Sequence, residues 1–229
     1  MALYPAHRLS LIAAAVGVIA VVALAGTGCS APPESASDDT GRLADVEVQQ
    51  YEGKRLGSIA DFRENSIKGP QEVDVATYRL KVVGEVADPL DLTYDEVLDR
   101  PSYEKVVRLN CVEGWSVDIL WEGVLIEDLL EQASYDEAAK VVIFRCEDGY
   151  STSLPLDYVL ERDILLASKM NGLDLPAERG YPFQVAAEDK WGYKWAKWVT
   201  SIEVSDNEAY EGYWEQRGYD NEADLPSAK

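Results

Sequence analysis

The chain has 229 residues, of which 47% are hydrophobic, and it carries a formal net charge of −21. A chain of this length can bury one substantial core, so a single domain is expected. The charge argues against nucleic acid and anionic membrane surfaces as partners. The single histidine, His7, removes most zinc-hydrolase and Ser-His-Asp chemistry, and three cysteines are too few for a disulfide scaffold.

The N-terminus has the pattern of an export signal. Arg8 is followed by an apolar or small-residue run over 9–28, and Cys29 stands before a polar, acidic stretch. Residues 1–29 therefore resemble a bacterial lipoprotein signal with Cys29 as the lipidated residue, although Gly26 stands where leucine is more usual. The alternative is an uncleaved anchor, because about 20 apolar residues can span a bilayer. Both interpretations predict an extracytoplasmic protein held to the membrane by its N-terminus.

The rest of the chain divides by composition. Residues 30–58 are polar and predict a flexible tether, residues 59–210 form the expected domain, and residues 211–229 form an acidic tail that wraps the surface or docks a partner. The first half of the domain should contain an ordered loop over 59–70, a strand over 77–86, a helix over 94–98 capped by Thr93, a strand-like run over 103–109 and a helix over 123–132. The second half should contain a strand over 140–145, a turn at Asp148 and Gly149 before another strand-like run, a helix over 155–160, a buried strand over 164–170 and a tight turn at Asn171 and Gly172. This irregular mixture predicts an α+β fold.

Cys111 follows a strand-like run over 103–109 and begins a turn that contains Glu113, Gly114 and Trp115. A thiolate is a soft metal ligand, and its reactivity depends on deprotonation and access. The alternative is a small buried apolar residue. A disulfide with Cys146 is a third possibility in an oxidising compartment. Glu113 is either a proton source or an ordinary solvated carboxylate.

The segment 179–202 is basic and aromatic in an otherwise acidic chain. It holds four cations separated by aromatic residues, namely Arg179, Lys190, Lys194 and Lys197. On a helix its tryptophans would share one face, but Gly192 favours a loop or a single turn. Cations beside flat rings suit a phosphorylated, planar heteroaromatic ligand. The alternative is a solvated charged face above a tryptophan core.

Four segments together, 109–116, 148–155, 171–183 and 191–204, resemble the sulfite-oxidase-fold molybdopterin oxidoreductases. They are most similar to the catalytic-domain-only members, such as the periplasmic methionine-sulfoxide reductases. The resemblance implies a single domain with a mixed β-sheet fold and one molybdenum-molybdopterin with a single pterin dithiolene. There is no haem motif.

The resemblance also assigns residues. Cys111 would be the molybdenum ligand, and Lys194, Trp195, Ala196 and Lys197 would hold the pterin phosphate. Arg179, Gln184 and Cys146 fall at polar pterin contacts, although arginine is common where Gln184 stands. Asn65 and Ser66, with Arg63 and Lys68, belong to a loop expected to close over the cofactor.

The family carries out oxygen-atom transfer. No arginine stands between Cys111 and Arg145, and the chain is acidic, so a sulfite dianion is disfavoured. The order Cys-Val-Glu-x-Trp resembles the methionine-sulfoxide-reductase branch and implies reduction of an S-oxide or N-oxide, with electrons from a membrane or cytochrome donor. Two alternatives remain: a sulfite-oxidising enzyme, and a tethered non-catalytic binding or electron-relay module, which the loss of arginine at Gln184 supports.

Overall fold

The computed structural model describes residue 43 and residues 45–226, which belong to one compact unit. The predicted signal or anchor over 1–29, Cys29 itself, most of the polar stretch up to residue 44, and residues 227–229 lie outside the described residues. Within the described part of the chain, no helix is both long enough and apolar enough to cross a bilayer.

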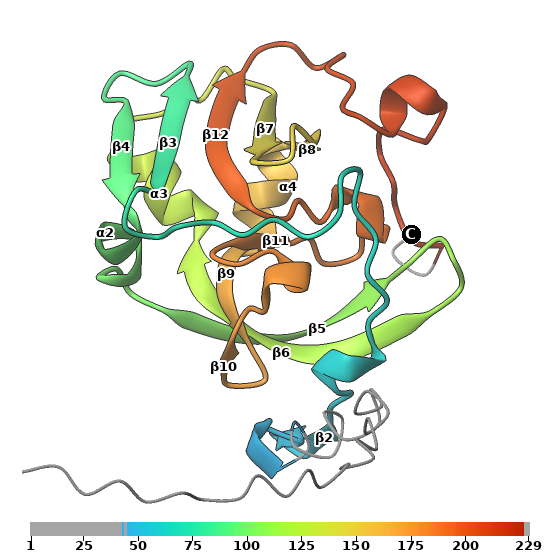
Figure 1. The fold of residues 1–229 in the computed structure, drawn as a ribbon. Helices are drawn as coiled ribbons and strands as arrows, with labels where there is room; N and C mark the ends of the chain where they lie inside the picture. The colour runs from blue at the N-terminus through green and yellow to red at the C-terminus, as the bar shows by residue number, and fades with distance from the viewer. Residues whose placement is uncertain (1–42, 44, 227–229) are drawn as a thin grey trace, which may run out of the picture. The chain divides into compact units, whose positions relative to one another are not determined.

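Two five-stranded sheets form the body (Figure 1). The first is antiparallel throughout and contains, in spatial order, β10 (Leu173–Asp174), β9 (Leu165–Met170), β6 (Ser116–Leu125) and β5 (Tyr103–Asn110), with β11 (Gln184–Ala186) also paired to β9. The second contains, in spatial order, β4 (Leu90–Thr93), β3 (Arg79–Gly84), β12 (Val199–Ser205), β7 (Val141–Cys146) and β8 (Ser151–Pro155). Only β3 and β12 run parallel in it.

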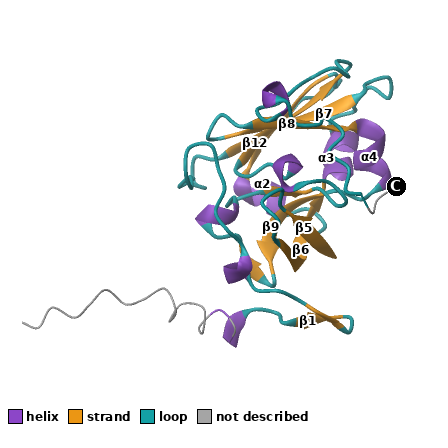
Figure 2. Ribbon diagram, turned by 90° about the vertical axis from the view of Figure 1, so that its right-hand side faces the viewer, coloured by secondary structure: helices purple, strands orange, loops and turns teal. Residues whose placement is uncertain are grey.

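Three short α-helices accompany the sheets, namely α2 (Tyr94–Leu98), α3 (Ile126–Gln132) and α4 (Leu156–Glu161). Figure 2 shows α3 and α4 at the level between the two groups of strands. The start of α2 follows the sequence closely, because Thr93 and Glu96 cap each other's backbone N–H groups in a capping box. The predicted helix over 123–132 begins only at Ile126, because β6 continues to Leu125. Mixed sheets with short helices confirm the α+β prediction.

The core lies between the two sheets and is made of large apolar side chains from both of them. Trp121 on β6 and Phe144 on β7 are fully buried. β7 has a central position in its sheet, and its first four residues, Val141 to Phe144, are all buried. Because successive side chains point to opposite faces of a sheet, both faces are covered here. The continuous apolar run that predicted a strand here reflects that central position.

Residues 45–58 differ from the predicted flexible tether. They contain the small hairpin β1 (Gln50–Tyr51) and β2 (Lys54–Arg55). Glu47 is buried and accepts hydrogen bonds from the Ser58 hydroxyl at 2.8 Å, from the Ile59 N–H at 3.0 Å and from the Asn171 amide at 2.8 Å. A composition average over 30–58 missed this segment, because one buried carboxylate with three donors is enough to order it.

The acidic tail likewise packs against the domain instead of beginning a separate region at residue 211. Its 3-10 helix η4 (Glu215–Arg217) carries a fully buried Glu215 side chain, which pairs with Lys194. Further along, the Trp191 N–H donates to the Ala223 carbonyl at 2.9 Å, and the Leu225 N–H donates to Asp189 at 2.9 Å. The described part of the tail, residues 211–226, therefore belongs to the folded domain.

Candidate functional site

A cavity of about 270 Å³ lies where five segments of the chain meet. The segments are the loop after η1 (Ile59–Asp61), the turn after β5, the turn between β7 and β8, the basic aromatic segment, and the tail. In Figure 1 the loop after η1 runs across the front of the domain on its way to β3. The residues that line the cavity include Asn65, Ser66, Cys111, Asp148, Arg179, Gln184, Tyr193, Trp195, Lys197, Trp214 and Tyr219.

Cys111 sits in a tight turn directly after β5. Its N–H donates to the Trp115 carbonyl at 2.9 Å, and its own carbonyl accepts from the Gly114 N–H at 3.0 Å. Gly114 has a φ of +87°, which a residue with a side chain adopts with difficulty. This is the turn that the sequence predicted. It orients Cys111 toward the cavity, whereas a continued strand would not.

The position of Cys111 relative to the basic segment is set by the backbone. An isolated parallel bridge joins Asn110 to Trp191. A Cβ atom on Gly192 would lie 3.2 Å from the Asn110 carbonyl oxygen, so this close approach favours glycine. Gly192 begins the single 3-10 turn η3 (Gly192–Lys194), as the loop-or-turn interpretation expected; an α-helix with aligned tryptophans does not form.

Cys111 is a nearly buried free thiol, and so is Cys146. The disulfide alternative is therefore contradicted. Burial raises the pKa of the Cys111 thiol, while a hydrogen bond from the Glu113 backbone N–H and the charges of Arg63 and Arg179 act in the opposite direction. A metal that binds the sulfur would hold it as the thiolate despite that burial.

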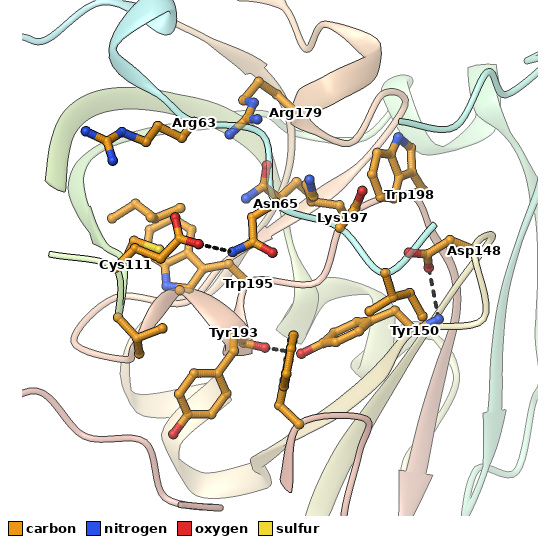
Figure 3. Close-up of a pocket in the computed structure, with 18 of the residues that line it drawn as sticks. Arg63, Asn65, Cys111, Asp148, Tyr150, Arg179, Tyr193, Trp195, Lys197 and Trp198 are labelled. Atoms are coloured by element: carbon orange, nitrogen blue, oxygen red, sulfur yellow. Dashed lines mark hydrogen bonds between the residues drawn. The ribbon is translucent and has the colours of Figure 1, made fainter. Parts of the chain in front are cut away.

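Glu113 bridges two parts of the cavity wall. Its Oε1 accepts from the Asn65 amide at 3.3 Å, and its Oε2 accepts from the Trp115 indole at 3.2 Å. Both carboxylate oxygens therefore have partners from the protein. Through this hydrogen bond Asn65 connects the segment after η1 to the Cys111 turn (Figure 3).

Lys197 lies on the cavity wall with its side chain 13% exposed. Its ammonium group contacts Glu64 at 3.3 Å and the Glu178 carbonyl at 3.1 Å, and it lies 4.4 Å from the Trp198 ring centroid. Burial, reinforced by the charge of Arg179, lowers the pKa of Lys197 to about 8. An anion placed beside Lys197 would stabilise its charged form.

Two polar atoms on the wall have no hydrogen-bond partner among the described residues, the Ser66 hydroxyl and Oε1 of Gln184. Buried polar atoms are almost always paired, so both suggest contact with a bound group. Together with one free thiol, the cations Arg179 and Lys197, and the indole rings of Trp195 and Trp198, they fit a metal-bearing, phosphorylated, planar cofactor.

Three of the expected contact residues lie elsewhere. The Lys194 ammonium is fully buried and binds Glu215 at 2.6 Å, Asn221 at 3.0 Å and the Ser153 carbonyl at 3.0 Å, instead of facing the cavity. Ala196 is buried, and its backbone is used in pairing with Val185. Cys146 is buried at the end of β7, off the cavity wall.

Other wall residues were not assigned from the sequence. Asp148 and Tyr150 belong to the quoted turn motif but carried no assigned role; the Asp148 carboxylate accepts from the Tyr150 N–H at 2.9 Å, and the Tyr150 hydroxyl donates to the Tyr193 carbonyl (Figure 3). Trp214 and Tyr219 come from the tail. The aromatic content of the tail was the available signal, but the tail was expected only to wrap the surface or to dock a partner.

The fold and this cavity, with one thiol and several cations on its wall, have the chemistry that suits a metal-containing, anionic cofactor. Residues 67–214 match the family model described as the oxidoreductase molybdopterin binding domain. The match covers more than half of the chain, which therefore belongs to the sulfite-oxidase-fold molybdopterin oxidoreductases. The expected family, its fold and the assignment as an oxidoreductase are confirmed.

Individual relatives agree with this. The chain is 37% identical over 151 residues to the uncharacterized oxidoreductase YuiH of Bacillus subtilis, 38% identical over 149 residues to the putative protein-methionine-sulfoxide reductase subunit YedZ1 of Azospira oryzae, and 31% identical over 188 residues to human mitochondrial sulfite oxidase. These matches cover 66%, 65% and 69% of this chain, and 76%, 56% and 34% of the respective relatives.

Among solved structures, the sulfane dehydrogenase SoxCD of Paracoccus pantotrophus superposes with a TM-score of 0.58 at 24% identity. The superposition covers 61% of this chain and 41% of that one. It shows a shared fold.

Proposed function

We propose that this protein reduces a neutral S-oxide or N-oxide, such as methionine sulfoxide, by oxygen-atom transfer outside the cytoplasm. The observation that carries the proposal is the wall beside the thiol, where Val112, the residue next to Cys111, is 47% exposed on the cavity. Neither Val112 nor its neighbours in the turn, from Glu113 to Trp115, carry a positive charge. A turn that offers an apolar side chain and no positive charge beside the thiol suits a neutral thioether oxide better than a dianion. The relationship to YedZ1 also supports it.

Several residues of the cavity wall have roles in this proposal. Cys111 would ligate the molybdenum, while Lys197, Arg179, Ser66 and Gln184 would hold the polar parts of the pterin. When bound, the molybdenum-molybdopterin supplies two-electron oxygen-atom chemistry. The balanced reaction is R₂SO + 2 H⁺ + 2 e⁻ → R₂S + H₂O. We assign Glu113 a positioning role and not that of a proton donor, because both of its carboxylate oxygens accept hydrogen bonds, from Asn65 and from Trp115.

A second candidate, sulfite oxidation, has one specific observation in its favour. Arg63 and Arg179 both line the cavity, and their charges act on Cys111. They come from segments before and after the cysteine, so the lack of arginine between Cys111 and Arg145 does not exclude them. Two cations near the metal site could hold a dianion. The relationship to human sulfite oxidase points the same way.

One pair of assays separates the two candidates. Protein loaded with molybdenum cofactor is mixed with reduced benzyl viologen and methionine sulfoxide, and separately with sulfite and ferricyanide. We expect dye oxidation in the first assay and slow turnover at best in the second. Activity confined to sulfite would overturn the proposal in favour of the second candidate.

We also propose that the N-terminus tethers the protein to the outer face of a membrane, where a membrane-bound or cytochrome donor delivers the electrons. The support is the signal-like sequence before Cys29. Radiolabelled palmitate should be incorporated into the wild type but not into Cys29→Ala, and the wild type should fractionate with membranes. Release of unlabelled wild type into the soluble cytoplasmic fraction would contradict this.

A further inference from the structure

The tail residues 213–225, called here the C-terminal strap, are fastened to the basic aromatic segment by several interactions. Lys194 pairs with Glu215 in full burial and also donates to Asn221 at 3.0 Å. The Tyr193 hydroxyl donates to the Asp220 carbonyl at 2.8 Å. Lys190, which is 4% exposed, pairs with Asp224 at 2.6 Å. Two buried lysines and one tyrosine hydroxyl therefore connect the strap to this segment.

The strap also forms part of the cavity wall. Trp214 and Tyr219 line the cavity, and their ring centroids lie 5.1 Å apart. Tyr219 meets Tyr193 edge to face, again with centroids 5.1 Å apart. The three rings make one aromatic surface. Tyr219 lies beyond the residues that match the family model, which end at residue 214.

The solvent exposure of the wall side chains indicates whether this aromatic surface lies near the cofactor or near the substrate. Tyr219 is 39% exposed and Val112 is 47% exposed, although both line the cavity, so they stand at its mouth. The groups suited to a pterin phosphate, Lys197 and Arg179, are instead well buried. Exposed aromatic and apolar side chains grouped at the mouth of a cavity are typical of ligand contact.

We propose that the C-terminal strap forms an apolar subsite that binds a bulky hydrophobic or aromatic substituent of the S-oxide substrate, with Tyr219 as the specificity-determining residue. This inference rests on the proposed S-oxide reduction. The buried Lys194–Glu215 pair positions the subsite before substrate arrives, so little side-chain ordering opposes binding. Small sulfoxides do not reach the strap and gain nothing from it.

The test compares Tyr219→Ala with a matched control, Tyr103→Ala. Tyr103 is 40% exposed, close to the exposure of Tyr219, and lies at the start of β5, off the cavity wall. The substrates are methyl p-tolyl sulfoxide and dimethyl sulfoxide, with reduced benzyl viologen as donor. We expect Tyr219→Ala to raise KM for the aryl sulfoxide by about tenfold, the value of one aromatic contact, with kcat and the dimethyl sulfoxide KM unchanged. Tyr219→Phe should restore the wild-type KM, and Tyr103→Ala should match the wild type throughout.

A second readout separates failure of the subsite from failure of the proposed reaction. Methyl p-tolyl sulfone cannot be reduced by this chemistry, and its binding can be followed by tryptophan fluorescence because Trp214 packs against Tyr219. Weaker sulfone binding to Tyr219→Ala supports the subsite even if the wild type reduces no sulfoxide. Equal loss of kcat/KM for both sulfoxides, unchanged sulfone binding, or a fall in bound molybdenum in Tyr219→Ala overturns the subsite.

Discussion

Nζ of Lys194 lies 2.6 Å from Oε1 of Glu215, and neither side chain has any exposed surface. The Thr152 hydroxyl donates to the same carboxylate oxygen at 2.6 Å. Burial lowers the pKa of Lys194, and the charge of Glu215 opposes that shift. This pair joins the turn η3, one side of which lines the cavity, to a segment 21 residues further along the chain.

Removal of one partner of this pair should be costly. In Glu215→Ala the Lys194 ammonium keeps its carbonyl and amide contacts but loses its counter-charge, so the free energy of unfolding should fall by about 3–5 kcal/mol. Urea unfolding followed by tryptophan fluorescence measures it.

The surface pair between Arg79 and Asp91 is the control. Both of its side chains are well exposed, and Asp91→Ala should cost less than about 1 kcal/mol because solvent screens the interaction. Similar losses in the two variants would contradict the central role of the Lys194–Glu215 pair.

Local signals predicted much of the fold. The capping box at Thr93, the strand that ends before Cys111, and the turn at Asn171 and Gly172 each depend on residues within a few positions of one another. Such contacts can be inferred from a linear sequence. Cys111 and Lys197 were identified as site residues for the same reason, since each stands in a compact motif and both line the cavity.

The parts that the sequence did not predict depend on distant partners. Lys194 and Lys197 are three residues apart and looked equivalent, but the single turn η3 directs the first toward Glu215 and leaves the second on the cavity wall. The buried Glu47 accepts a hydrogen bond from Asn171, which lies 124 residues further along the chain. A charged residue in a polar stretch gives no local sign that it will find such a partner.

Cys111 and Cys146 should differ sharply in their effect on the cofactor. Cys111→Ser replaces a thiolate that lines the cavity by a hydroxyl, a much poorer ligand for a soft site, so bound molybdenum should drop to background. Cys146→Ala removes a buried thiol off the cavity wall and should retain molybdenum, with a loss of stability of about 1 kcal/mol. Metal analysis of the two purified variants measures their molybdenum content. Retention by both variants would remove Cys111 as the ligand.

Glu113→Gln tests whether this carboxylate moves a proton. The amide keeps the size of the side chain and can still accept a hydrogen bond from Asn65 or Trp115, so a positioning role predicts a fall in kcat of less than about tenfold. If Glu113 were a general acid, the same substitution would lower kcat by about 10²–10⁴-fold and remove one limb of the pH profile. The pH dependence of kcat/KM, compared between wild type and variant, distinguishes the two roles.

The unpaired amide oxygen of Gln184 predicts opposite effects on stability and on cofactor binding. In Gln184→Met the buried oxygen that lacks a partner disappears, so the cofactor-free protein should be as stable as the wild type or more stable by about 1 kcal/mol. Cofactor retention should fall, because a polar contact is lost. For comparison, Thr152→Val removes a hydroxyl that is already paired and should destabilise by about 1–3 kcal/mol. A destabilised Gln184→Met would show that its oxygen has a partner in the folded protein.

Lys197 should make stability depend on pH in the alkaline range. Its pKa is lowered to about 8 in the folded protein, from an ordinary value of 10.5. Between these values the unfolded chain binds more protons than the folded one, so this residue makes stability rise with pH through the window. Between pH 7.5 and pH 10.5, the free energy of unfolding of the cofactor-free wild type should rise by up to about 3 kcal/mol relative to that of Lys197→Met. Urea unfolding of both proteins across that range measures the difference. Parallel curves of unfolding free energy against pH for the two proteins would mean that Lys197 is solvated. A phosphate bound beside Lys197 should reduce the difference between the two curves, because it holds the ammonium charged in the folded state.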